Sequence, residues 1–247
     1  MRTSAVGALL WKELRQMGRN RTAMLTATFL PFIILFLAPL QLIFAFRAGG
    51  RSFDQLRQAP LPGFSDVTDP AQLIVQFVYP MLLVFGGMLL PSVTTTYAIV
   101  AERERRSLEL LVSLPVSVSE ILASKLIAVL ALTAIVGLPY VAVVIAVLLV
   151  LGIADASAIP ALLAPFIAAV ACSTAISLLL TLLARDFRTA NNLNGVFFVP
   201  VLFVTIATLS AVGGPARTYV LSAMLLVLAA LAVLIAMRWV TFERYLE

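Results

Sequence analysis

Six long apolar stretches constrain the fold of this chain more than any other feature of its sequence. They run from Thr22 to Phe46, Gln72 to Val100, Lys125 to Leu151, Ile159 to Ala184, Gly195 to Val212 and Tyr219 to Trp239. A helix needs about 20 apolar residues to cross a bilayer core of roughly 30 Å, and these stretches are of that length. None has the strict polar and apolar alternation of a membrane barrel strand. The sequence therefore predicts an all-α, polytopic membrane protein with six transmembrane helices.

The composition supports this class and excludes several kinds of site. Apolar residues make up 62% of the chain and charged residues only 12%, against about 25% charged in a soluble domain. Histidine is absent, which excludes histidine metal sites and Ser-His-Asp nucleophile systems. The single cysteine, Cys172, cannot form an internal disulfide. We expect neither a catalytic residue nor a metal site in this chain.

The distribution of lysine and arginine predicts the orientation in the bilayer. Six spans place both termini on one side of the membrane. Of the 17 Lys and Arg residues, only four lie in the connections on the opposite side, namely Arg47, Arg51, Arg57 and Arg217. Because basic residues concentrate on the cytoplasmic side, both termini are predicted to be cytoplasmic. The net charge of +5 then reflects membrane orientation, and we expect no nucleic-acid partner.

The chain is expected to form one membrane domain over residues 1–247. Its predicted parts are an amphipathic interface helix (1–21), spans one and two (22–100) with an outer loop (47–71), a cytoplasmic turn (101–124), spans three to six (125–239) and a cytoplasmic tail (240–247).

The chain lacks the residues that usually power ion-driven transport, and only sodium sites made of backbone and hydroxyl oxygens stay open as an alternative. Apart from Lys125 and Arg238 at their ends, the predicted spans hold no acidic or basic residue, so proton relays and carboxylate sodium sites lack their usual groups. A phosphate-binding loop needs a Gly-Lys pair, but the two lysines, Lys12 and Lys125, follow Trp11 and Ser124. If ATP drives this protein, a partner must bind it.

The N-terminal arm is predicted to be an amphipathic helix. One face carries the apolar residues Val6, Leu10, Leu14 and Met17, and the other carries Lys12, Arg15 and Arg19, with Trp11 at the boundary. Such a helix lies in the headgroup layer among membrane lipids. Two interpretations remain open: a simple membrane anchor, or a helix whose polar face also contacts a cytoplasmic subunit.

The cytoplasmic turn between spans two and three has a more specific pattern. Residues 102–106 form a charged end to span two, and Leu108, Leu111 and Val112 form a small apolar patch behind Ser107, a candidate N-cap. Pro115 then ends the short helix, and Ser117-x-x-Glu120 is a capping box that starts the next one. A plain basic loop would not need the apolar patch, so we favour a docking helix for a partner.

Two features of the spans are interpreted as structural. Gly86 and Gly87 permit close helix approach in span two. Asn191, Asn192 and Asn194, next to Asp186, are interpreted as part of a capped helix start, with a polar entry for substrate as the alternative.

Two of these segments resemble the type-2 permease family of ATP-binding-cassette (ABC) transporters, whose fold is that of type V exporters. That family shows a Glu-Arg-Glu-x-Gly-Thr-Leu-Glu stretch, then a proline and a Glu-Ile before a lysine. The matching residues here are Glu102, Arg103, Glu104, Ser107, Leu108, Glu109, Pro115, Glu120, Ile121 and Lys125, with Arg106 in place of the glycine and Ser107 in place of the threonine. The segment from Trp11 to Arg15 is similar to the interface helix that precedes span one in the family.

The resemblance implies a half-transporter in the inner (plasma) membrane of a bacterium or archaeon. Its partners would be a cytoplasmic ABC ATPase that binds ATP and magnesium, a second permease copy in a homodimer or mixed pair, membrane lipid and an unidentified substrate. The implied ATPase-coupling residues are Glu102, Arg103, Glu104, Arg105, Ser107, Leu108, Glu109, Leu111, Val112 and Pro115, and those of the interface helix are Trp11, Lys12, Glu13, Arg15 and Arg19.

Family members often carry short re-entrant helices between spans five and six, whereas the link here, Gly213 to Arg217, is brief. A haem-exporter B subunit shares the six spans and the leucine-rich turn and remains an alternative. The second alternative is a membrane anchor or regulator that recruits an ATPase and transports nothing.

Overall fold

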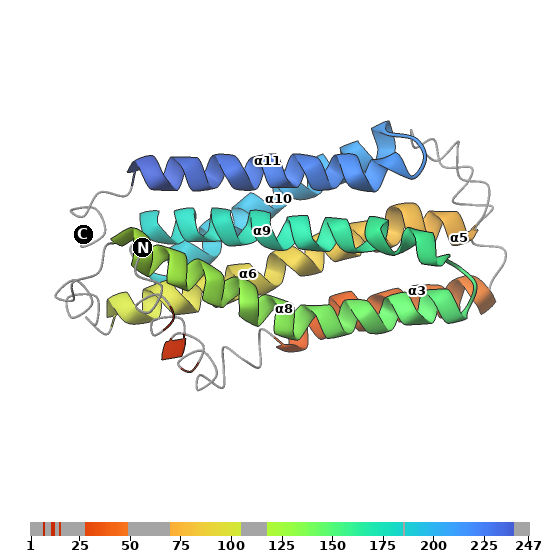
Figure 1. The fold of residues 1–247 in the computed structure, drawn as a ribbon, viewed down its shortest axis with the longest axis horizontal. Coiled ribbons are helices and arrows are strands. Elements are labelled where there is room, and N and C mark those ends of the chain that lie inside the picture. The colour runs from red at the N-terminus through yellow and green to blue at the C-terminus, as the bar shows by residue number, and fades with distance from the viewer. Residues whose placement is uncertain are drawn as a thin grey trace.

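The computed structural model describes residues 7, 11, 12, 15, 28–48, 70–104, 118–184 and 186–239, and these form an elongated helical bundle (Figure 1). Within these ranges six helices are long and apolar enough to cross a membrane. Span one is Thr28–Ala45, which includes the π-helical turn η1 (Phe32–Leu37) and continues into α3 (Ala38–Ala48). Span two comprises α5 (Pro70–Leu73), the π-helical turn η2 (Ile74–Val78) and α6 (Tyr79–Glu104). Spans three to six lie in α8 (Val118–Val150), α9 (Ile159–Leu183), α10 (Phe187–Ala211) and α11 (Ala216–Trp239), and the 3-10 turn η3 (Ala156–Ala158) precedes α9.

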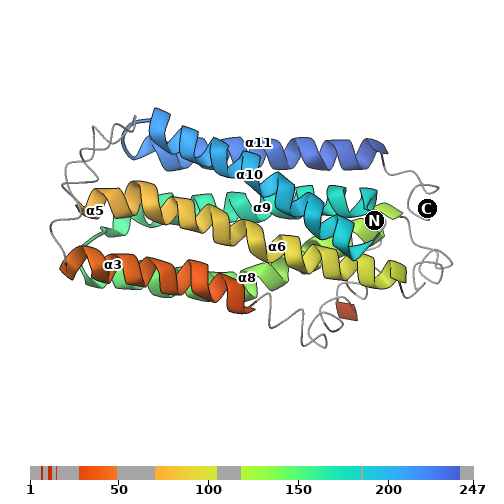
Figure 2. The same cartoon turned by 180° about the vertical axis from the view of Figure 1, so that it is seen from behind.

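The predicted all-α membrane fold with six spans is confirmed. Each predicted apolar stretch overlaps one of the observed spans. The helix α8, which leads into span three, is described from Val118 onward. Ser117 lies outside the described residues, so the capping box stays a prediction. Consecutive spans run antiparallel, so the end of α6, the start of α8 and the end of α11 lie at one end of the bundle. The end of α3 and the start of α5 lie at the other (Figures 1 and 2).

The fourth span, α9, is the centre of the bundle. It is the most buried of the six spans and packs most extensively against α6 and α11. Its buried face is built from small residues, including Ala168, Ala169, Cys172 and Ala175. Lipid tails are as apolar as leucine, so helices in a bilayer associate through close van der Waals packing, which small residues permit.

Three helices meet at the ring of Phe166, which is only 2% exposed. A Cβ added at Gly87 of α6 would lie 3.2 Å from Phe166 Cδ2, and one added at Gly137 of α8 would lie 2.6 Å from Phe166 Cζ. The Phe166 ring, on α9, is therefore held between two glycines on neighbouring helices. The other glycine of the pair in span two, Gly86, faces Leu35 of span one. Both Gly86 and Gly87 thus serve helix packing.

Prolines account for the two π-helical turns. The turn η1 ends at Leu37, two residues before Pro39, and η2 ends at Val78, two residues before Pro80. A proline inside a helix lacks an N–H and its ring clashes with the carbonyl four residues earlier. That carbonyl lies within the π-helical turn in both cases, and the wider turn makes room for the ring.

The connections between later spans are short. After α8, Gly152 adopts a φ of +66°, its N–H donates to the Leu149 carbonyl, and the N–H of Ile153 donates to the Leu148 carbonyl. These two bonds form a Schellman motif, which needs a left-handed residue and so favours glycine. Between α10 and α11 residues 212–215 form only a turn, so this fully described link contains no re-entrant helix.

Candidate coupling site

The helix α6 leads directly into the predicted coupling turn. It remains helical through Glu102, Arg103 and Glu104, and α8 begins at Val118 at the same end of the bundle (Figure 2). The two long helices therefore frame residues 105–117. The coupling residues Arg105, Ser107, Leu108, Glu109, Leu111, Val112 and Pro115 lie outside the described residues, and their roles stay predictions.

Side-chain hydrogen bonds tie α6 to three other spans. The Tyr79 hydroxyl donates to the Val141 carbonyl of α8 at 3.4 Å, and Ser173 Oγ of α9 donates to the Met88 carbonyl at 2.6 Å. Asn194 Nδ2 of α10 donates to Thr96 Oγ1 at 3.2 Å. A movement of α6 would thus act on α8, α9 and α10 together.

The bond between Asn194 and Thr96 is the one nearest to the coupling turn. Asn194 is 5% exposed and Thr96 1% exposed. The Thr96 hydroxyl in turn donates to the Ser92 carbonyl at 2.8 Å, so it both accepts and donates. A buried polar group without a partner costs free energy, and this arrangement gives a partner to the Asn194 amide nitrogen and both an acceptor and a donor role to the Thr96 hydroxyl.

The start of α10 differs from the sequence interpretation. The N-cap is Asp186: its Oδ1 accepts from the Thr189 N–H at 2.7 Å, and its Oδ2 accepts from the Thr189 hydroxyl at 3.0 Å. The backbone N–H of Thr189 is the main reason why the pKa of Asp186 lies below its usual value. Asn191, Asn192 and Asn194 all follow the first turn, so their interpretation as part of the cap is wrong. Asn191 and Asn192 are exposed, whereas Asn194 joins α10 to α6.

The described part of the N-terminal arm is helical and exposed. Gly7, Trp11, Lys12 and Arg15 have helical backbone, and the Trp11 side chain is 69% exposed. Glu13 and Arg19 lie outside the described residues, as does the predicted apolar face with Val6, Leu10, Leu14 and Met17. An interface role for this arm is therefore still a prediction.

Two cations that the sequence places at the edges of spans are buried. Lys125 of α8 is 1% exposed, and Arg217 at the start of α11 is 0% exposed, with its Nε donating to the Gly214 carbonyl at 3.0 Å. Their burial could not be read from the sequence, because both lie next to polar residues in segments assigned to span ends. Buried cations are tolerated only where hydrogen bonds or ion pairs compensate for lost hydration.

The arrangement is suited to mechanical transmission. Across the described ranges, no group of three or more His, Cys, Asp or Glu side chains could hold a metal ion. The structure offers two long helices, α6 and α8, whose ends bound residues 105–117, and α6 is hydrogen-bonded to three other spans.

Comparison with known proteins identifies the family. No curated protein and no solved structure matches the chain significantly. The family model described as ABC-2 family transporter protein matches residues 7–221, from the N-terminal arm to the first residues of α11. The chain therefore belongs to the ABC-2 transporter family and is a multi-pass membrane protein of the permease type.

Proposed function

We propose that this chain is the permease subunit of an ATP-driven exporter with the type V fold. In this proposal it lies in the inner membrane of a bacterium or archaeon, with both termini cytoplasmic, and pairs with a second permease copy. A separate ABC ATPase binds ATP and magnesium and supplies the energy, and this chain has no catalytic site of its own. The observation that supports the proposal most is the family match over residues 7–221.

The coupling turn connects the end of α6 to the start of α8, and this connection explains how a partner could move the bundle. An ATPase that displaces residues 105–117 would pull or push α6 and α8 at once, because the turn joins their ends. Thr96 lies eight residues before Glu104, or roughly 12 Å along the helix axis. The displacement would therefore reach the bond to Asn194, and with it α10, within about two turns of the coupling turn.

The N-terminal arm supplies a second contact surface in this proposal. Trp11, Lys12 and Arg15 are exposed on a helix that precedes span one. Basic side chains at the cytoplasmic surface interact with anionic lipid headgroups, and tryptophan prefers the headgroup layer. The arm would lie on the membrane and meet the ATPase along its polar face.

Variants of the coupling turn test the proposal in vesicles that contain the permease and its ATPase. Glu104→Ala, Glu109→Ala and the pair Leu108→Ala with Leu111→Ala should release or uncouple the ATPase while membrane insertion stays intact. Asp155→Ala is the matched control, because Asp155 is an exposed acid in the connection that follows α8, at the end of that helix away from residues 105–117. Substrate accumulation and substrate-dependent ATP hydrolysis should fall in the turn variants and remain unchanged in the control.

Two outcomes would contradict the proposal. Undiminished transport in the turn variants would remove the coupling role of residues 105–117. A wild-type chain that binds the ATPase, yet shows neither substrate accumulation nor substrate-dependent hydrolysis, would be a membrane anchor or regulator.

Cysteine labelling tests the proposed orientation. With a membrane-impermeant maleimide, Ser52→Cys should react from outside the cell and Ser107→Cys only after the membrane is opened. The native Cys172 is 0% exposed, so background labelling of the folded protein should be low. The reverse pattern would show that the termini are external.

A further inference from the structure

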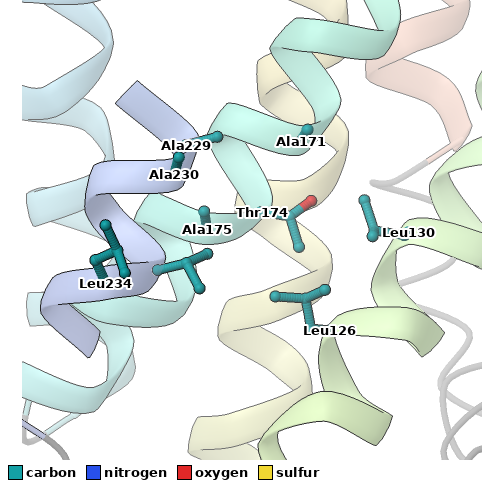
Figure 3. Close-up of a pocket in the computed structure, with 9 residues that line it drawn as sticks. Leu126, Leu130, Ala171, Thr174, Ala175, Ala229, Ala230 and Leu234 are labelled. Atoms are coloured by element: carbon teal, nitrogen blue, oxygen red, sulfur yellow. The ribbon is translucent and has the colours of Figure 1, made fainter. Parts of the chain in front are cut away.

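An apolar groove lies on the outer surface of the bundle, between α8 and α11. Its floor is formed by Ala171, Thr174 and Ala175 of α9, and Leu130 and Leu234 stand on its two sides (Figure 3). The groove has a volume of about 420 Å³, which lies in the range of small-molecule sites. It exists because the floor side chains are small while its flanks carry leucines.

The lining of the groove selects an apolar occupant. Thr174 supplies the only hydroxyl among the residues that line it, and Thr174 Oγ1 donates to the Val170 carbonyl of its own helix at 2.6 Å. The groove therefore presents no polar group that needs a partner. It is formed by residues of α8, α9 and α11, all three of which are membrane spans, so it lies at the depth of the bilayer.

A cation lies at one end of the groove. Ala230, Leu234 and Arg238 follow one another at intervals of four residues along α11 and so share one helix face. Arg238 is exposed and lies one turn, roughly 6 Å, beyond Leu234. The other nearby cation, Lys125, precedes Leu126 of the groove but is only 1% exposed. Of these two described cations, Arg238 is thus the one that a surface ligand could reach.

We propose that the groove binds one acyl chain of an anionic phospholipid, whose headgroup pairs with Arg238. The apolar lining fits the chain, and the exposed guanidinium at the same helix face fits the phosphate. In the proposed orientation this lipid belongs to the cytoplasmic leaflet. The assignment does not depend on transport or on the ATPase.

Quenching of tryptophan fluorescence by brominated lipids tests this site in the full-length chain. The reporter is Leu234→Trp, at the rim of the groove, in a chain that also carries Trp11→Phe and Trp239→Phe. Val227→Trp is the matched control, since Leu234 and Val227 are 54% and 59% exposed on the same helix but only Leu234 lines the groove. Vesicles contain either brominated phosphatidylglycerol or brominated phosphatidylcholine.

The groove reporter should prefer phosphatidylglycerol about fivefold, the effect expected of one basic side chain beside an anionic headgroup, and the control reporter should show no such preference. Arg238→Gln should abolish the preference. Ala230→Leu, which fills the groove, should weaken quenching by both lipids, whereas Ala223→Leu, an exposed alanine of α11 outside the groove, should not.

Three results would overturn the proposal. If the two lipids quench both reporters in the same ratio, the groove holds only ordinary boundary lipid. If the preference for phosphatidylglycerol survives Arg238→Gln, the headgroup does not pair with Arg238. Weak quenching by both lipids together with disulfide formation between Leu234→Cys copies would show that a second copy covers the groove. Native mass spectrometry of the chain without the reporter gives an independent measurement: one retained phosphatidylglycerol, lost with Ala230→Leu and kept with Ala223→Leu, is the expected result.

Discussion

The contact of Phe166 with two glycines allows one packing prediction to be worked out in detail. In Gly137→Ala the new Cβ would start 2.6 Å from Phe166 Cζ, and a second neighbour, Leu90 Cδ1, would lie at 3.2 Å. The ring cannot simply retreat, because its Cδ2 lies against the Gly87 position of α6 on the next helix. Overpacking of this kind typically costs about 1–3 kcal/mol.

The intrinsic preference of helices for alanine acts in the opposite direction and is worth about 1 kcal/mol. Gly195→Ala isolates that term, because Gly195 is also helical but no atom lies within 4 Å of its added Cβ. The difference in the free energy of unfolding between the two variants, measured in mixed micelles, should therefore be about 1–3 kcal/mol, with Gly137→Ala the less stable.

A double-mutant cycle tests the stated cause. Phe166→Leu should cost stability in the wild-type chain, because it opens space in the core, and should cost less in the Gly137→Ala chain, because it relieves the clash. The reasoning is refuted if Gly137→Ala is as stable as Gly195→Ala, or if Phe166→Leu costs the same in both chains.

Two further predictions concern α10. Asn194→Ala should reduce the amount of substrate moved per ATP hydrolysed more than Asn191→Ala does, because only Asn194 bonds to Thr96 of α6, and equal ratios in vesicles would exclude this tie from coupling. Asp186→Ala should lower the unfolding midpoint at neutral pH, because the carboxylate accepts two hydrogen bonds from Thr189. Since the pKa of Asp186 is lowered in the folded protein, this stabilisation is present above the unfolded pKa of roughly 3.9 and is lost as the pH falls through the folded pKa. Asp186→Asn keeps an acceptor oxygen without a titratable charge and should lack that pH dependence. A stability difference between wild type and Asp186→Ala that does not change with pH would contradict the assignment.

The six spans could be predicted from the sequence because they depend on local properties. A segment that crosses a bilayer must satisfy its own backbone hydrogen bonds and be apolar over a set length, so each span is visible in the sequence by itself. The match of Glu102–Glu104 and the following turn to the permease pattern is local in the same sense. For this reason the family could be identified although the structure does not describe residues 105–117.

Which helix faces meet was decided only by the tertiary structure. Spans such as α8 and α9 are apolar all round, so no polar face in their sequences indicates which side packs inward. Asn194 and Thr96 are 98 residues apart in the sequence, and they are hydrogen-bonded only because the fold brings α10 against α6. The groove beside α9 and the burial of Lys125 and Arg217 likewise arise from side chains of different helices. Crossing the bilayer is a property of each segment, whereas packing within it is a property of pairs of segments.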